Sequence, residues 1–128
     1  MTRLILCRHG QTEWNVLGRY QGKSDVPLNA EGVRQAYLLA EDLSQEPIDA
    51  VYASNLQRAW NTAEIVAERH ALQVTRDPRL NEIDEGVWEG LTLAEILEAY
   101  AEDLALWEER PLEKGPTGGE TIHDLSTR

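Results

Sequence analysis

The sequence lacks the features that define several large classes of protein. It has one cysteine, Cys7, so no disulfide can form within the chain, as is usual in the reducing cytoplasm. It has no apolar run long enough to span a bilayer, and its N-terminal apolar stretch is too short for a signal peptide. No Cys or His residues are grouped at metal-ligand spacing. We therefore expect a cytoplasmic protein with no membrane partner, no metal and no other cofactor.

Positive charge is also scarce. The chain has 12 Lys and Arg against 23 Asp and Glu, a formal net charge of −11. This balance excludes a protein that wraps nucleic acid or docks on anionic lipid, because both functions need a basic face. Arginines gathered at one place in so acidic a chain would reverse the local field, which suits a phosphorylated small molecule as the partner.

The length of the chain limits its organisation. Its 128 residues suffice for one small domain and are too few for two ordinary ones. A chain of this size buries about two-thirds of the surface that its unfolded form exposes, so it can have a core of its own. We therefore interpret residues 1–128 as a single domain.

The stretch that opens the chain combines a strand pattern with reactive side chains. Residues 4–7 are an apolar run that predicts a buried strand, with Cys7 as a small buried residue in it. Arg8, His9 and Gly10 follow at once, and ligands of open α/β sheets bind where strands end. A guanidinium can grip phosphate, a ring nitrogen can attack phosphorus, and a glycine lets the backbone approach the ligand.

Two consecutive segments resemble a known family. The unbroken string Arg8-His9-Gly10-Gln11-Thr12-Glu13-Trp14-Asn15 resembles the signature of the histidine phosphatase superfamily, also called the phosphoglycerate mutase-like family. The next loop is similar to the family at Gln21, Gly22, Asp25, Pro27 and Leu28. The resemblance implies that His9 is the nucleophile, that Arg8 binds phosphate, and that Thr12 and Asn15 donate hydrogen bonds to it. It also implies that the Gln21-Gly22 backbone lies near the substrate.

A second arginine, Arg58, occupies a position in the chain that a bound anion would explain. Arg58 lies in the first turn of a predicted helix, where a cation opposes the helix dipole unless an anion is shared with the free amides. The segment with Ser54, Arg58-Ala59 and Thr62-Ala63 resembles the string that follows the second strand of the superfamily. The resemblance implies that Arg58 is a second phosphate clamp.

Residues 82–89 are dense in carboxylates, and composition alone favours a solvated acidic loop. Repulsion among carboxylates raises the pKa of a buried one, which is how a carboxyl group becomes a proton donor. The stretch resembles the superfamily's Leu-x-Glu followed by Gly-x-Trp-Glu-Gly. The resemblance implies that Glu82 is the proton donor and acceptor, a role that Asp84, Glu85 and Glu89 do not inherit.

Periodicity and capping residues predict the other elements. Asn29 is the expected N-cap of a helix that ends before Pro47, with an apolar face of Val33, Ala36, Tyr37, Ala40 and Leu43. Strands are predicted at 48–53 and 73–75, a long helix from a Thr92–Glu95 capping box to about Glu109, and a turn at 115–121 that leads into a helix. The strands at 4–7 and 48–53, with the helix between them, predict a parallel βαβ unit.

The fold class expected from these elements and from the resemblance is α/β, with three layers and a mostly parallel sheet. In the family, the region of the long helix leans over the site and helps to set substrate choice. Tyr100 and Trp107 lie on the apolar stripe of this helix, and we expect them to pack rather than to contact substrate.

One part of the family pattern is absent. Members of the superfamily have a further strand and a second catalytic His-Gly after this point, and neither His70 nor His123 stands in the right place. We therefore expect the chain to be the N-terminal portion of a longer protein, with an unpaired edge on its first strand. Completion of the sheet by a partner chain is the alternative.

The function predicted is hydrolysis of a phosphomonoester through a phosphohistidine on His9. A phosphoglycerate mutase uses the same groups, but the residues around Glu82 favour the phosphatase branch, similar to alpha-ribazole phosphatases and broad-specificity enzymes. A non-catalytic phosphate-binding fragment is the alternative from another class, because the second histidine is missing. The sequence leaves a homodimer open and does not choose the substrate.

Overall fold

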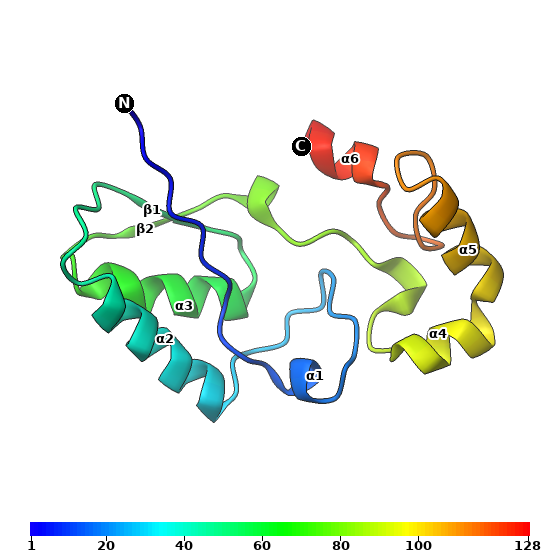
Figure 1. Cartoon of the computed structure of the whole chain (residues 1–128), viewed down its shortest axis with the longest axis horizontal. Coiled ribbons are helices and arrows are strands. Elements are labelled where there is room, and N and C mark those ends of the chain that lie inside the picture. The colour runs from blue at the N-terminus through cyan, green and yellow to red at the C-terminus, as the bar shows by residue number, and fades with distance from the viewer.

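The computed structural model describes residues 1–128 as two parts joined by the middle of the chain (Figure 1). The first part contains helices α2 (Ala30–Asp42) and α3 (Gln57–Glu68) and strands β1 (Val51–Ala53) and β2 (Val74–Arg76). The second contains α4 (Leu93–Ala99), α5 (Ala101–Glu109) and α6 (Ile122–Thr127). Short elements connect them: α1 (Glu13–Val16) and the 3₁₀ helices η1 (Pro78–Leu80) and η2 (Gly86–Trp88). None of the helices is long and apolar enough to cross a membrane.

The sheet confirms the predicted α/β class. Strands β1 and β2 pair in parallel, with Val51 opposite Val74 and Ala53 opposite Arg76. Helix α3 connects them, so the βαβ unit of this chain is β1-α3-β2. The predicted βαβ unit between residues 4–7 and 48–53 is wrong, because the earlier segment forms no strand.

The N-terminal segment is the main correction to the sequence analysis. Residues 1–10 form no helix or strand, and Leu4 and Leu6 are 80% and 92% exposed. Cys7, expected to be buried, is exposed as well. A strand needs a neighbouring strand to satisfy its backbone groups, and neither β1 nor β2 pairs with this segment. The apolar run is therefore uncovered, and the expected strand with an unpaired edge is not formed.

Helices α2 and α3 pack together through small side chains. The Asn29 side chain accepts a hydrogen bond from the Gly32 amide, which confirms it as the N-cap of α2. The buried residues of α2 are Gly32, Ala36 and Ala40, spaced four apart. Val33 and Tyr37, predicted to face the core, are 38% and 52% exposed. The alanines allow α2 to approach α3 closely, and Gly32 packs against the backbone of Gln11. The helix is therefore rotated from the predicted face.

The second part is built around Trp88. Its ring packs edge-on against Tyr20 and Trp107, with ring centroids 6.2 and 6.1 Å apart. The buried core here also contains Ile96 and Leu104. The Thr92 capping box is present, but the predicted long helix is two helices, because Tyr100 leaves the helical region (φ −137°, ψ 33°).

We expect Trp88→Ala to lower the free energy of unfolding by about 3–5 kcal/mol, because it removes the largest side chain of this core. Leu97→Ala is the control: Leu97 is 52% exposed on α4, and its truncation is expected to cost about 0.5 kcal/mol. Urea unfolding followed by circular dichroism measures both. Equal losses for the two variants would mean that Trp88 does not organise the second part.

Candidate active site

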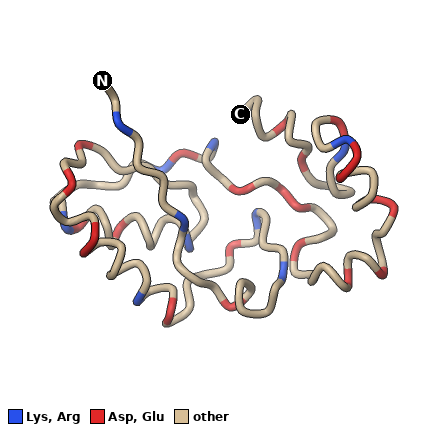
Figure 2. Tube along the Cα trace, viewed as in Figure 1, with Lys and Arg blue, Asp and Glu red and all other residues tan.

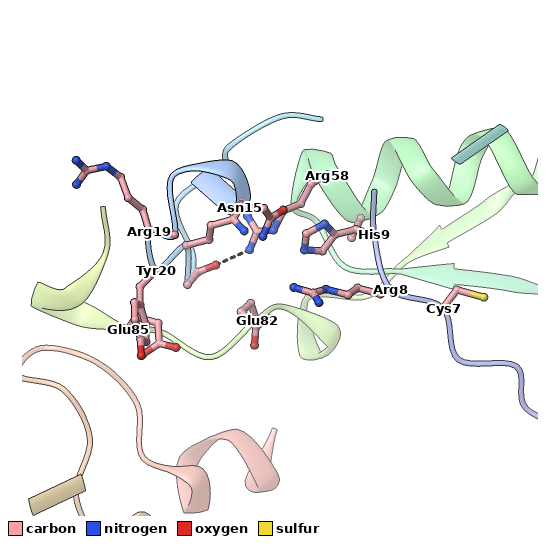
Figure 3. Close-up of a pocket in the computed structure, with 13 residues that line it drawn as sticks. Cys7, Arg8, His9, Asn15, Arg19, Tyr20, Arg58, Glu82 and Glu85 are labelled. Atoms are coloured by element: carbon pink, nitrogen blue, oxygen red, sulfur yellow. Dashed lines mark hydrogen bonds between the residues drawn. The ribbon is translucent and has the colours of Figure 1, made fainter. Parts of the chain in front are cut away.

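A cavity of about 500 Å³ opens where the two parts of the chain meet (Figure 3). Its walls come from the N-terminal segment, the loop after α1, the start of α3 and the acidic segment after η1. The lining residues are Cys7, Arg8, His9, Asn15, Gly18, Arg19, Tyr20, Gln21, Gly22, Arg58, Ala59, Glu82 and Glu85. The volume is in the range of about 300–1,000 Å³ that is common for small-molecule sites.

His9 presents one ring nitrogen to this cavity. Its Nδ1 lies 2.7 Å from the carbonyl oxygen of Gly10, which can only accept, so Nδ1 carries the proton. Nε2 is then left with a free lone pair. Burial lowers the pKa of His9 below its ordinary 6.5, and the charges of Arg58 and Arg8 lower it further. The imidazole is therefore neutral near pH 7, the form that a nucleophile needs.

The backbone beside His9 is fixed by two contacts with the helices. The Gly10 amide donates to the Thr62 hydroxyl at 3.1 Å, and that hydroxyl donates to the carbonyl of Arg58 at 2.7 Å. Gly10 also lies so close to Gly32 on α2 that a Cβ on it would overlap the Gly32 carbonyl. Glycine is thus required for packing, and Gly10 does not line the cavity.

Thr12 is likewise placed beside the cavity rather than in its wall. It is fully buried, caps α1, and donates from its hydroxyl to Gln21 Oε1 at 2.7 Å. The Thr12 amide donates to Asn15 Oδ1 at 2.9 Å, which leaves the Nδ2 hydrogens of Asn15 without a partner in the chain. Asn15 and Gln21 do line the cavity, so Thr12 orients two side chains that face it.

Arg58 has the buried position expected of a clamp. Only 2% of it is exposed, and it is the second residue of α3. Its Nη1 and Nη2 donate to the carbonyls of Ser24 and Gly22 at 2.8 and 2.7 Å. A guanidinium has five N–H donors, so three remain for a ligand. Burial lowers the pKa of Arg58, but a guanidinium stays charged at neutral pH.

The loop that carries Gly22 is held from two sides. Asp25 accepts from the amide of Gln57 at the start of α3, at 2.7 Å. Glu89 accepts from the amide of Lys23 at 2.7 Å and from the Ser24 hydroxyl. Gly22 has φ +49°, and a Cβ there would overlap Glu89. This loop is therefore a rigid wall rather than a free surface turn.

Arg8 completes what we call the cationic end of the cavity, formed by Arg8, His9 and Arg58. The Arg8 side chain is exposed and has no hydrogen bond or ion pair within the chain. Figure 3 shows Arg8 and Arg58 on either side of the His9 ring. Two guanidinium groups around a neutral imidazole are a suitable arrangement for a phosphoryl group.

Glu82 lies across the cavity from His9 (Figure 3), and its backbone is held by Arg128, the residue after α6. Arg128 donates from Nη2 to the carbonyls of Asn81 and Glu82, at 2.9 and 3.2 Å. Arg128 itself is paired with Glu120 at 2.9 Å. The Glu82 side chain is exposed, so water reaches its carboxyl group.

Glu85 also lines the cavity, and the sequence analysis gave it no role. Burial raises the pKa of Glu85 to about 7, and the charges of Glu82, Glu89 and Asp84 raise it further. The same segment appears as a run of acidic positions between the two parts of the chain in Figure 2. The buried carboxyl group with a raised pKa in this segment is thus Glu85, while the family motif points to Glu82.

The structure therefore brings together seven of the nine predicted site residues: Arg8, His9, Asn15, Gln21, Gly22, Arg58 and Glu82. Gly10 and Thr12 lie behind the wall. Thr62 and Arg128 also support the site, and neither had a role predicted from the sequence. Thr62 could have been identified from the sequence, because it lies one helical turn after Arg58 and so shares its helix face. Nothing in the sequence identifies Arg128, since only the tertiary structure brings it to its partners Glu120 and Asn81.

Comparisons with known proteins show the family of the chain. The family described as histidine phosphatase superfamily (branch 1) matches residues 4–128. The chain is 43% identical to phosphoserine phosphatase 1 of Hydrogenobacter thermophilus, over 100% of this chain and 61% of that protein. It is 41% identical to a Proteus mirabilis protein named "Probable phosphoglycerate mutase GpmB", over 100% of this chain and 60% of that one.

Solved structures give the same result. The alpha-ribazole phosphatase of Shigella flexneri superposes with a TM-score of 0.84 at 35% identity, over 93% of this chain and 59% of the other. The chain thus spans about 60% of the length of these relatives. The resemblance to the superfamily inferred from the opening motif is confirmed, and so is its alpha-ribazole phosphatase branch as a near neighbour.

We expect ¹⁵N NMR at pH 7 to show His9 as a neutral imidazole protonated at Nδ1, because Nδ1 donates to Gly10. Its titration midpoint should lie below the ordinary 6.5, since burial disfavours the charged ring. The spectrum of His9→Gln assigns the resonance by its loss. A midpoint above 6.5, or a proton on Nε2, would contradict this geometry.

Glu85 predicts a pH dependence of stability. Its pKa rises from 4.5 to about 7 on folding, so the folded chain holds this proton more tightly than the unfolded one. The contribution of Glu85 to stability therefore falls as the pH rises through this window. Relative to wild type, Glu85→Gln should become progressively more stable from about pH 5 to pH 8. Urea unfolding measures it, with the exposed Glu98→Gln as a charge-matched control. A pH-independent difference would show that the Glu85 carboxyl is ordinary.

Proposed function

The chain belongs to the histidine phosphatase superfamily, and on that premise we propose that it carries the nucleophile half of a phosphomonoesterase that works through a phosphohistidine on His9. The observation that supports this most is the cationic end of the cavity. There a neutral ring nitrogen lies between the guanidinium groups of Arg8 and Arg58, with a carboxyl group, Glu82, facing it. The name of the Hydrogenobacter relative, a phosphatase, supports the same reaction.

In the first step, Nε2 of His9 attacks the phosphorus of the ester. A P–N bond forms and the P–O bond to the alcohol breaks, with its electron pair passing to the alcohol oxygen. That oxygen takes the proton of the Glu82 carboxyl group and leaves as the free alcohol. Arg8 and Arg58 neutralise charge on the non-bridging oxygens throughout, and Asn15 Nδ2 donates a further hydrogen bond.

In the second step, water attacks the phosphorus of phosphohistidine. The P–N bond breaks, its electron pair returns to Nε2, and the Glu82 carboxylate takes the proton that water loses. Inorganic phosphate leaves, and both side chains regain their starting forms. The hydrogen bond from the Gly10 amide to Thr62 fixes the Gly10 backbone. The Gly10 carbonyl accepts from Nδ1–H of His9, so the imidazole stays aligned through both steps.

A phosphoglycerate mutase is the second candidate, supported by the name of the Proteus relative. It would use the same first step and then return the phosphoryl group to a substrate hydroxyl instead of water. Hydrolysis is preferred because the segment after Glu82 reads Ile83-Asp84-Glu85, where mutases of this type usually have Arg-His-Tyr.

We also propose that the substrate is a small phosphorylated metabolite and that the protein acts in the cytoplasm. The size of the cavity and its cationic end support the former. A lone, exposed thiol at Cys7 supports the latter, because it persists best in a reducing compartment.

We expect the chain to release phosphate from p-nitrophenyl phosphate and His9→Gln to reduce the rate by at least about 10³-fold, since the nucleophile is lost. Rapid acid or base quenching with ³²P-labelled substrate should give a label that is stable to base and labile to acid. His123→Gln, a change at an exposed histidine of α6, is the matched control and should keep full activity.

Each outcome separates the candidates. Release that survives His9→Gln would overturn the mechanism. Transfer of the label to a second hydroxyl of phosphoglycerate rather than to water would identify a mutase. Binding of inorganic phosphate with neither release nor label would identify a non-catalytic phosphate-binding chain.

A further inference from the structure

One acidic side chain of the cavity has no part in the proposed mechanism. Glu85 lines the wall with Tyr20, and Figure 3 shows both at the end opposite Arg8 and His9, with Glu82 between. A phosphomonoester held by the cationic end would therefore extend its alcohol portion towards Glu85. This makes the side chain a candidate for contact with the part of the substrate that is not phosphate.

The carboxyl group of Glu85 has no partner within the chain. It forms no ion pair, and no hydrogen bond reaches its side-chain oxygens. The cations nearby are engaged elsewhere: Lys23 pairs with Asp84 at 3.1 Å, and Arg19 pairs with Glu95 at 3.0 Å. The Glu85 carboxyl group is therefore a hydrogen-bond acceptor in the cavity wall that has neither a donor nor a cation as its partner.

The wall around Glu85 is rigid, which suits recognition. The Tyr20 amide donates to Leu91 at 2.9 Å, and the Gly90 amide donates to the Tyr20 carbonyl at 2.8 Å. The Tyr20 ring packs on buried Trp88. These contacts hold the backbone after η2, and the Glu120 amide holds it before η2 by donating to the Asp84 carbonyl at 2.9 Å. Glu85 is therefore presented at a fixed place rather than on a mobile loop.

We propose that Glu85 determines specificity in this cavity and selects phosphomonoesters whose alcohol carries an ammonium group. This inference rests on the proposed function, because it takes the cationic end as the phosphate site. The cavity then has a charge at each end, positive for the phosphoryl group and negative for the amine. A zwitterionic phosphomonoester matches this pattern in a chain of net charge −11.

The surroundings of Glu85 favour an ammonium over a neutral hydroxyl. Burial raises the pKa of Glu85 to about 7, and the charges of Glu82, Glu89 and Asp84 add to this rise and make the potential at Glu85 more negative. An ammonium both donates a hydrogen bond and neutralises this charge, whereas a hydroxyl only donates. A methyl group does neither and leaves the carboxylate desolvated.

The test compares binding of three matched ester series at pH 8, where Glu85 is ionised. The probes are ethyl, propyl and butyl phosphates that end in an ammonium, a hydroxyl or a methyl group. The three chain lengths vary the distance between the phosphate and the terminal group. Isothermal titration calorimetry gives Kd for wild type, Glu85→Gln and Glu98→Gln. Glu98 is exposed on α4 and gives the same charge change away from the cavity.

For at least one chain length, wild type should bind the ammonium ester about tenfold more tightly than the methyl ester, as a charge-assisted hydrogen bond allows. Glu85→Gln should remove this preference, and Glu98→Gln should keep it. Binding that shows no ammonium preference in wild type, or a preference that survives Glu85→Gln, would overturn the inference while the phosphate site stands.

Two further results also decide the matter. A hydroxyl ester that binds as tightly as its ammonium counterpart would overturn the choice of an amine, and would identify Glu85 as a hydroxyl acceptor. Failure of every ester and of inorganic phosphate to bind would overturn the proposed function itself, and this inference with it. Because removal of a buried charge raises stability, Glu85→Gln is expected to fold, and its circular dichroism spectrum verifies that.

Discussion

The site depends on one short chain of hydrogen bonds between the N-terminal segment and α3. The Gly10 amide donates to Thr62, whose hydroxyl donates to the carbonyl of Arg58. Residues 1–10 have no strand partner, so this link and the close approach of Gly10 to Gly32 fix where His9 lies. His9 and Arg58, the proposed nucleophile and phosphate clamp, are therefore positioned by the same helix, and their relative geometry is kept even though the preceding residues are uncovered.

A second constraint is the separation of charge within an acidic protein. The cavity places Arg8 and Arg58 beside His9, and it places Glu82 and Glu85 on the facing wall. The positive and negative groups are held by different contacts. Arg58 donates to a carbonyl of the loop at Gly22, and Arg128 donates to the backbone carbonyl of Glu82. Neither Arg8 nor Arg58 forms an ion pair with Glu82 or Glu85. Both sets of charges remain free for a ligand that carries both signs.

The sequence predicted local structure well where local interactions decide it. The N-caps at Asn29 and Thr92 are present, because a side chain that satisfies an amide three residues on is a short-range interaction. The strand at 4–7 failed for the opposite reason: an apolar run becomes a strand only beside a partner, and none of the described residues provides one. The rotation of α2 also escaped prediction, since small residues outweighed larger apolar ones in contact with α3.

By itself, the sequence determined the family, because its motifs around Arg8, His9, Arg58 and Glu82 are specific and are read without knowledge of the fold. Only the tertiary structure decided that Gly10 and Thr12 support the wall while Glu85 forms part of it. Burial and the charges of neighbouring groups set that difference, and both are properties of distance in space. Residues remote in sequence, such as Thr62 and Arg128, acquire their roles in the same way.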